Sequence, residues 1–439
     1  MLHSKIWEAF CEQKVVSTDT RKIQPGDIYF ALRGENFDGN KFASAALDAG
    51  AAFAVVDREE VVVEGDTRFI LVEDTLLALQ ELGKMKRESM GIPFIGITGS
   101  NGKTTTKELL HTVLDSERSA YATTGNLNNH IGVPLTLLAI PDETDIAVIE
   151  MGANKPKDIE ELVNIALPTH GLITNIGQAH LEGFGGIEGV KKTKGELFDF
   201  IRANNGFVFV NEGDVHIAEI GLDLPNQIGY GGPESSYRIL NSTEDETGQD
   251  VKVWASGKEM DFRIQLQGRH NAENALVALM VGQHFGISDE GIQAALAAYK
   301  PEMNRSQLIV RNEKKYMLDA YNANPSSMRA AIHSIALQDH KNVGLILGDM
   351  FELGEKSAEL HTELWQYARK ELPNAKVIGV GKGMIATMPK SDSKMRSYSE
   401  VEEAKASIKE DLEGCSYILI KGSRGMALER LLPSLGVEI

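Results

Sequence analysis

The segment GITGSNGKTTTKELL, residues 96–110, decides how this chain is interpreted. It overlaps an apolar, β-branched run at 92–98 and leads into a segment at 104–114 whose apolar residues repeat at helical spacing. A buried strand, a glycine turn and a helix start form an anion site, because backbone N–H groups and the helix dipole face the phosphate. The spacing is one residue longer than usual, with five residues between Gly96 and Gly102. An ordinary glycine-rich turn is the alternative.

The residues of this loop have distinct expected roles. Gly99 and Gly102 leave room for phosphate oxygens to approach the backbone, and Lys103 supplies a positive charge. Thr104 is placed to hold Mg²⁺. We therefore predict a nucleotide site formed by Gly99, Ser100, Asn101, Gly102, Lys103, Thr104 and Thr105.

Length and composition are typical of a soluble protein with several domains. At 439 residues the chain exceeds what one hydrophobic core usually organises, so we expect about three domains. A net charge of −18 argues against nucleic-acid or anionic-membrane binding, and no apolar run is long enough for membrane insertion. The N-terminal stretch does not resemble a leader peptide, and Cys11 and Cys415 have no metal-ligand spacing. We expect a reduced, cytoplasmic protein.

Three sections of the chain carry α/β patterns. Residues 1–90 read as a small unit, residues 91–300 alternate apolar strands with helices, and residues 301–439 contain a third strand–helix series. Within the middle section, residues 230–266 favour an antiparallel β insertion. The predicted fold class is α/β with three domains. A central doubly wound, mostly parallel sheet with the variant phosphate loop is flanked by a small N-terminal α/β domain and a C-terminal Rossmann-like α/β domain.

Two further strand ends are candidates for metal binding. The run DIAVIEMGAN ends its apolar part at Glu150, and an acid at the carboxyl end of a parallel strand beside a phosphate loop is well placed to hold Mg²⁺. The segment ITNIGQAHLEGFGG carries His180 after a strand, as a possible metal or phosphate ligand. A solvated carboxylate and a structural histidine are the alternatives, and the residues alone leave His180 open.

Several polar loops are candidates for ligand contacts. Asn271 opens the helical segment GRHNAENALVA, where it either caps the helix or contacts a base. Asp319 ends a strand, and the turn at 321–325 reads as a second ligand-binding lip. The loop TTGNLNNHIG supplies uncharged donors and acceptors, with turn formation as the alternative, from Asn126, Asn128 and Asn129.

The segment IEGVKKTKGELFDFI, residues 187–201, places a lysine on an apolar helix face. Lys194 lies on the stripe formed by Val190, Leu197, Phe198 and Ile201, whereas Lys191 and Lys192 fall largely off it. A lysine that points inward finds a partner or loses its proton, because burial lowers its pKa. A neutral amine reacts with CO₂ to give a carbamate, an oxygen ligand suited to Mg²⁺. The alternative is a lysine that extends to solvent or pairs with Glu196 or Asp199.

Taken together, these motifs resemble the Mur ligase family over essentially the whole chain. The resemblance rests on GSNGKTTT, the strand ending at Glu150, NIGQAHLEGFG with KGELF, GRHNAENALVA, YNANP and GDMFELGE. It explains the variant loop, since the family uses this Gly-x-x-Gly-Lys-Thr-Thr form. YNANP and GDMFELGE are typical of the members that add D-alanyl-D-alanine to UDP-N-acetylmuramoyl-tripeptide, the last cytoplasmic step in making the peptidoglycan precursor.

The resemblance implies ATP-driven amide formation through an acyl phosphate in the bacterial cytoplasm, with two Mg²⁺ ions, a carbamylated Lys194 and a monomeric enzyme. The implied catalytic residues are Lys103, Glu150, His180 and Lys194, and the implied metal ligands are Thr104, Glu150, His180 and Lys194. ATP contacts beyond the phosphate loop are expected from Asn271, Arg305 and Asp319. Substrate contacts are expected from Asp19, Thr20, Arg21, Asp38 and Asn40 on the uridine side, and from Asn126, Asn128, Asn129, Tyr321, Asn322 and Asn324.

Other activities stay open at this level. A sister ligase, such as the diaminopimelate- or lysine-adding enzyme or folylpolyglutamate synthetase, would share the central domain, although the Asp-Asn-Pro-Arg motif of the diaminopimelate enzyme is absent. A kinase would release a phosphorylated substrate. A nucleotide switch would hydrolyse ATP slowly without regard to any amine.

Overall fold

The strand before the phosphate loop lies inside the largest sheet of the molecule. The computed structural model describes residues 2–178, 180–245, 247–301, 306–338 and 340–437. The strands of this central sheet are β7 (Phe94–Thr98), β8 (Ala120–Ala122), β9 (Ile146–Glu150), β10 (His170–Ile173), β11 (Phe207–Asn211), β12 (Gln227–Tyr230), β13 (Tyr237–Asp245), β14 (Gly248–Ala255) and β15 (Lys258–Ile264). They are arranged in the order β15-β14-β13-β12-β11-β10-β7-β9-β8.

Most of this sheet is parallel, as the apolar strand runs predict. β7 pairs in parallel with β9 on one side and β10 on the other, so their carboxyl ends meet at one edge. The insertion is antiparallel as expected, because β14 pairs antiparallel with both β13 and β15, while Tyr230 of β12 is in register with Tyr237 of β13.

Helices cover both faces of the central sheet and enclose two hydrophobic cores. One face packs against α4 (Lys103–Leu114), α10 (Arg269–His284) and α11 (Asp289–Ala298). The opposite face packs against α5 (Gly132–Leu138), α6 (Asp158–Ala166), α8 (Ile187–Ala203) and α9 (Val215–Gly221). The short α7 (Leu181–Phe184) precedes α8. This two-sided packing confirms the doubly wound arrangement.

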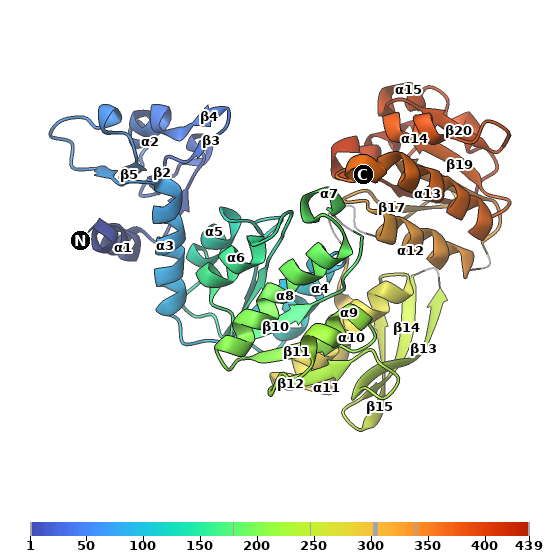
Figure 1. Cartoon of the computed structure of the whole chain (residues 1–439), viewed down its shortest axis with the longest axis horizontal. Helices are drawn as coiled ribbons and strands as arrows, with labels where there is room; N and C mark the ends of the chain where they lie inside the picture. The colour runs from blue at the N-terminus through green and yellow to red at the C-terminus, as the bar shows by residue number, and fades with distance from the viewer. Residues whose placement is uncertain (1, 179, 246, 302–305, 339, 438–439) are drawn as a thin grey trace.

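The N-terminal unit is a small parallel sheet in the order β1-β2-β5-β6. Its elements are α1 (Leu2–Gln13), β1 (Val16–Ser17), β2 (Ile28–Phe30), β3 (Arg33–Gly34), β4 (Phe37–Asp38), α2 (Ala43–Asp48), β5 (Phe53–Val56), β6 (Phe69–Leu71) and α3 (Thr75–Glu88). Asp74 caps α3 by accepting hydrogen bonds from Leu76 N and Leu77 N at 2.8 and 2.9 Å. This helix runs from the N-terminal sheet to the central unit (Figure 1). It approaches Pro134 of the central unit so closely that a Cβ atom added to Gly83 would lie only 2.9 Å from that proline.

The C-terminal unit has a third sheet in the order β16-β17-β21-β18-β19-β20, parallel except for the β16–β17 pair. Its strands are β16 (Gln307–Arg311), β17 (Lys314–Asp319), β18 (Val343–Gly348), β19 (Lys376–Val380), β20 (Met395–Tyr398) and β21 (Tyr417–Lys421). Its helices are α12 (Pro325–Ala336), α13 (Ser357–Glu371), α14 (Lys382–Thr387), α15 (Val401–Lys405) and α16 (Ile408–Asp411). Hydrophobic cores lie on both faces.

Figure 1 shows these units as blue, green-to-yellow and orange-to-red bodies arranged along the molecule, with the central unit between the other two. The α/β class with a central doubly wound sheet and two flanking α/β units is therefore confirmed. Across the described residues, no helix combines the length and the apolar character needed to cross a membrane.

Candidate active site

The phosphate loop follows β7 and ends in the glycine that caps α4. Gly99 and Gly102 have φ angles of 151° and 76°, which favour glycine over other residues. A Cβ on Gly99 would collide with the hydroxyl of Thr174. The Lys103 amine donates to the Gly99 carbonyl at 2.7 Å and thus folds back over the loop. The first N–H groups of α4 have no partner inside the helix, so this end offers donors to an anion.

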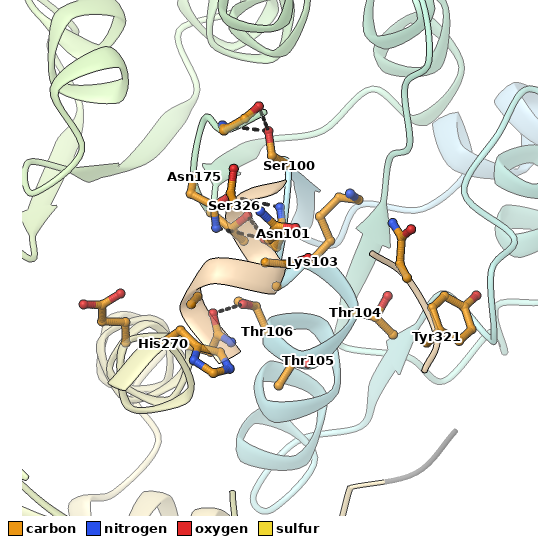
Figure 2. A pocket seen from close by; sticks show the side chains of 18 of the residues that line it. Ser100, Asn101, Lys103, Thr104, Thr105, Thr106, Asn175, His270, Tyr321 and Ser326 are labelled. Atoms are coloured by element: carbon orange, nitrogen blue, oxygen red, sulfur yellow. Dashed lines mark hydrogen bonds between the residues drawn. The ribbon is translucent and has the colours of Figure 1, made fainter. Parts of the chain in front are cut away.

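A neighbouring segment holds the first half of the loop in place. Asn175 accepts the Asn101 N–H on its Oδ1 at 2.9 Å and donates its Nδ2 to the Asn101 carbonyl at 3.0 Å. Thr174 Oγ1 donates to the same carbonyl at 2.6 Å. Ser100 Oγ donates to the Gly177 carbonyl and accepts from the Gly177 N–H. These contacts fix the carboxyl ends of β7 and β10 to one another, and Figure 2 shows Asn175 beside Asn101.

Glu150 lies at the end of β9, directly against the start of α4. Its carboxylate accepts hydrogen bonds from Thr104 Oγ1 at 2.9 Å and from Asn128 Nδ2 at 2.8 Å, and its own N–H donates to Thr123. The residue is only 2% exposed. The alternative of a carboxylate surrounded by solvent is therefore wrong, and Glu150 is a buried acid beside the phosphate loop.

This pair of residues fits a hard cation. The Thr104 hydroxyl and the Glu150 carboxylate present oxygen atoms, the ligand type that Mg²⁺ prefers, next to the lysine of the phosphate loop. Within the described ranges no cluster of three or more His, Cys, Asp or Glu side chains has metal-site geometry. Any cation here would thus take part of its shell from phosphate or water.

Lys194 is buried on the inner face of α8, as the helical periodicity predicts. It is 1% exposed, and its amine lies 5.9 Å from the ring centroid of Phe184. The partners considered from sequence are engaged elsewhere, since Glu196 accepts the N–H groups of residues 157 and 160, and Asp199 pairs with Arg202. Among the described residues, no hydrogen-bond or ion-pair partner reaches the amine. Burial lowers its pKa well below the ordinary value, and the charge of Lys103 adds to the shift.

His180 begins α7 with a left-handed backbone, at a φ of 52°. Its Nδ1 atom pairs with the carboxylate of Glu352, which belongs to the C-terminal unit. Burial lowers the pKa of His180, the charges of Lys103 and Lys194 lower it further, and Glu352 opposes the shift. The charge of Lys103 thus lowers the pKa of both His180 and Lys194, although the three residues come from three separate segments.

Many of these groups line a cavity of about 610 Å³ between the central and C-terminal units. The predicted site residues that line it are Ser100, Asn101, Gly102, Lys103, Thr104, Thr105, Asn126, Asn128, Glu150, His180, Asn271, Asp319, Tyr321 and Asn322. The predicted site residues that do not line the cavity are Gly99, Asn129, Lys194 and Asn324, and the five of the N-terminal unit, Asp19, Thr20, Arg21, Asp38 and Asn40. Arg305 lies outside the described residues.

The C-terminal wall is organised by a buried ion pair. Lys421, at the end of β21, bonds Asp319 at 2.6 Å and the Asn322 carbonyl at 3.1 Å. Burial alone would raise the pKa of Asp319, but the Lys421 charge and His270 keep it below the ordinary value. Asp319 is therefore an anion held by a neighbouring lysine.

The opposite wall comes from the start of α10. Gly268 is the N-cap residue, so the alternative that Asn271 caps this helix is wrong, and the ATP contact expected from Asn271 stays a prediction. Asn271 Nδ2 instead donates to the Gln267 carbonyl at 2.7 Å, and its Oδ1 accepts from Asn274 at 3.3 Å. Asn274 in turn accepts from Thr106 of α4 at 3.1 Å, which joins this wall to the phosphate-loop helix.

Two predicted asparagines make their contacts within the protein. Asn129 Oδ1 accepts from Ile131 N and Gly132 N at 3.1 and 2.8 Å, which is the turn role considered from sequence. Asn324 caps α12 by accepting from Ser327 N at 2.9 Å, and its Nδ2 donates to Asn101 Oδ1 at 2.7 Å.

The candidate residues of the N-terminal unit form a separate polar group. Asp19 caps the 3₁₀ helix Thr20–Lys22 and is paired with Arg21, while Asp38 caps the next one and accepts from Asn40. Burial raises the pKa of Tyr29 to about 12, and the carboxylates of Asp19 and Asp38 add to the shift. The Tyr29 hydroxyl donates to the carbonyl of Gly39, the residue after Asp38, at 3.0 Å, and none of these residues lines the 610 Å³ cavity.

Sequence reasoning missed several residues that line the cavity or hold it, among them Asn175, His270, Asn274, Ser326 and Lys421. Two of these carried a usable signal. Asn175 closely follows a buried strand, and Lys421 ends the apolar strand YILIK, where a charged side chain needs a partner.

Comparison with known proteins agrees with the site. Three family models match the chain: the "Mur ligase family, catalytic domain" at residues 12–87, the "Mur ligase middle domain" at 97–282, and the "Mur ligase, glutamate ligase domain" at 304–424. The chain belongs to the Mur ligase family. Members of this family are ATP-dependent ligases, so the phosphate loop is that of an ATP-using enzyme.

Individual Mur ligases resemble the chain over nearly its full length. UDP-N-acetylmuramoyl-tripeptide–D-alanyl-D-alanine ligase from Bacillus subtilis is 35% identical over 429 residues, which is 96% of this chain and 92% of that protein. A crystal structure of MurF from Acinetobacter baumannii superposes with a TM-score of 0.88 at 31% identity, covering 96% and 93% of the two chains. The structure of MurF ligase from Thermotoga maritima in complex with ADP has a TM-score of 0.85 at 26% sequence identity, and the match covers 96% of this chain and 97% of that chain.

Proposed function

We propose that this Mur ligase joins the terminal carboxylate of UDP-N-acetylmuramoyl-tripeptide to the amine of D-alanyl-D-alanine, with conversion of ATP to ADP and phosphate. The observation that carries the proposal is the full-length identity of 35% to a ligase of that name. The cavity agrees with it, since it combines a phosphate loop, a buried acid and a polar wall from a second unit.

In the first step the substrate carboxylate attacks the γ-phosphorus of ATP, giving an acyl phosphate and ADP. Two anions approach each other in this step, so positive charge at the transferring group lowers the barrier. Lys103 and the N-terminus of α4 would supply it, because the lysine amine lies over the loop and the first N–H groups of the helix are available to an anion there.

We expect two Mg²⁺ ions at this site. When bound, they would neutralise the negative charge of the phosphates. Thr104 and Glu150 would hold it through oxygen atoms, and His180 would add a nitrogen ligand on release from Glu352. Lys194 would contribute after carbamylation, in which its neutral amine adds to CO₂ and one proton is released. The buried amine has a lowered pKa and, among the residues that the structure describes, no hydrogen-bond or ion-pair partner, and both properties support this modification.

In the second step the amine of D-alanyl-D-alanine attacks the carbonyl carbon and phosphate leaves. The C-terminal unit provides the wall facing the phosphate loop, with Asp319, Tyr321 and Asn322 lining the cavity. We infer ATP contacts from Asn271, Asp319 and Arg305. We infer muramoyl-side contacts from Asn126, while Asn128 holds Glu150.

The N-terminal unit is assigned to the uridine nucleotide. Asp19, Thr20, Arg21, Asp38 and Asn40 form its polar group. We propose the unit boundaries at residues 90/91 and 300/301, a monomeric state, and a place in the bacterial cytoplasm, where the reaction completes the peptidoglycan precursor.

One assay tests this function against its rivals. Phosphate release is measured with ATP, Mg²⁺ and UDP-N-acetylmuramoyl-tripeptide, with and without D-alanyl-D-alanine, and the product mass is determined. The proposed ligase releases phosphate only with the dipeptide and yields a product heavier by the dipeptide less water. A phosphorylated product, or ATP hydrolysis that ignores the dipeptide, refutes it.

A further inference from the structure

The turn YNANP at 321–325 reaches across the domain junction and touches the phosphate loop itself. Asn324 Nδ2 donates to Asn101 Oδ1 at 2.7 Å, over a sequence separation of 223 residues. Next to it, Ser326 Oγ accepts the N–H of Gln178 at 2.9 Å. Figure 2 shows Ser326 and Asn101 side by side, with Asn175 next to them.

Both ends of the Asn324 amide are already used. Its Oδ1 caps α12 by accepting from Ser327 N, its Nδ2 holds Asn101, and the residue is 4% exposed. A side-chain amide in this state has little capacity left for a substrate. The substrate contact expected of Asn324 from the sequence stays a prediction, while the hydrogen bonds of the structure give its amide partners within the chain.

The other side of the contact is equally constrained. The backbone of Asn101 is held on its N–H and its carbonyl by Asn175 and Thr174, so its side chain is directed outward from a fixed position. Gln178 lies two residues before His180, which pairs with Glu352 of the C-terminal unit. The C-terminal unit thus contacts the phosphate loop at Asn101, and it contacts the His180 loop at Gln178 and at His180 itself.

We propose that Asn324 and Ser326 form a clamp, defined as the pair of hydrogen bonds Asn324–Asn101 and Ser326–Gln178, that positions the phosphate loop for phosphoryl transfer when the C-terminal unit is docked. The clamp residues do not touch the reacting atoms and act through Asn101 and Gln178. The inference rests on the proposed function for its substrates, but its geometry stands on contacts within the chain. Misplacement of a reacting group by about 1 Å costs ~10²-fold in rate, so a small shift of the loop is sufficient.

A double-mutant cycle tests the clamp. Asn324→Ser keeps a good N-cap residue but is too short to reach Asn101, and Asn101→Ala removes the bond from the other side. Each single variant is expected to lower kcat by about 10- to 100-fold, with KM for both non-nucleotide substrates changed less than about 3-fold. The kcat of the double variant is expected to be no lower than that of the less active single variant, because both substitutions remove the same Asn324–Asn101 hydrogen bond. Asn374→Ser, an exposed C-terminal asparagine bonded to Lys394, is the matched control with wild-type rates.

Two results overturn the clamp: losses that add up in the double variant, or a selective rise in KM for D-alanyl-D-alanine in Asn324→Ser. If Asn324→Ser does not fold, Ser326→Ala takes its place, because it removes the acceptor for the Gln178 N–H. Its kcat and KM are then compared with those of Asn101→Ala by the same criteria. If the wild type makes no amide product, the proposed function fails, and titration of the same variants with ADP decides the clamp separately. The clamp is supported if both single variants bind ADP more weakly than the wild type and the double variant shows no further loss of affinity. The clamp is refuted if ADP affinity is unchanged, or if the losses of the two single variants add up in the double variant.

Discussion

Replacement of Glu150 by glutamine separates the charge of this residue from its hydrogen bonds. The amide of Glu150→Gln can still accept from Asn128 Nδ2 and can donate to Thr104 Oγ1, because a hydroxyl both donates and accepts. The free energy of unfolding should therefore change by no more than about 1 kcal/mol. In Glu150→Ala both donors lose a buried acceptor, at about 1–3 kcal/mol each, so a loss of ~2–6 kcal/mol is expected.

The catalytic effect of Glu150→Gln should be large despite the retained fold. Because a neutral amide would hold Mg²⁺ less tightly than a carboxylate, the phosphates would be less well neutralised, and kcat is expected to fall by about 10²- to 10³-fold. The Mg²⁺ concentration for half-maximal rate should rise about 10-fold or more, since one anionic ligand is lost. Binding of the uridine nucleotide should be unchanged, because the polar group that we propose for it lies in the N-terminal unit.

The assay follows amide formation across a Mg²⁺ series, with uridine-nucleotide affinity measured by calorimetry. Glu143→Gln removes the same charge from an exposed position shortly before β9 and serves as the control. A Glu150→Gln enzyme with wild-type turnover and Mg²⁺ dependence would refute the metal assignment. Loss of uridine-nucleotide affinity at unchanged Mg²⁺ dependence would place Glu150 in another site.

Four further outcomes are expected. Lys103→Ala should remain folded but lose turnover by ~10³-fold, and near-normal rates would contradict the phosphate-loop assignment. Gly99→Ala should lose ADP binding in a titration, because φ is 151° and the new Cβ meets Thr174. Lys194→Ala should be nearly inactive and partly rescued by a small carboxylic acid, whereas electron density for a bare ammonium in an active, Mg²⁺-loaded crystal would exclude the carbamate. Because the folded pKa of the unmodified Lys194 lies below 10.5, only the unfolded chain binds a proton there, so in CO₂-free buffer the wild type should gain stability relative to Lys194→Met as pH rises toward 10.5.

Local patterns predicted the parts of the site that depend on one segment. The apolar runs before Gly99 and up to Glu150 became β7 and β9, and parallel pairing alone brings their carboxyl ends together. Helical spacing placed Lys194 inward, and its stripe neighbours Val190 and Leu197 are fully buried.

Contacts between units could not be predicted in this way. Asn324 with Asn101, and His180 with Glu352, depend on how two separately folded sheets dock, and no periodicity within either segment encodes that orientation. The alternative role of Asn271 as a helix cap is excluded by a neighbouring residue. Gly268, three residues earlier, takes the N-cap position, and this leaves the Asn271 amide to bond the preceding turn.

The long separation between Asn101 and Asn324 also bears on synthesis at the ribosome. Domains generally fold in the order in which they emerge, so the central sheet with its phosphate loop can form while the C-terminal unit is still being made. Such a nascent chain holds Lys103 and Glu150 but has neither Asn324 nor Glu352 to hold Asn101 and His180. We therefore expect incomplete chains to bind nucleotide weakly and to leave ATP intact until translation ends.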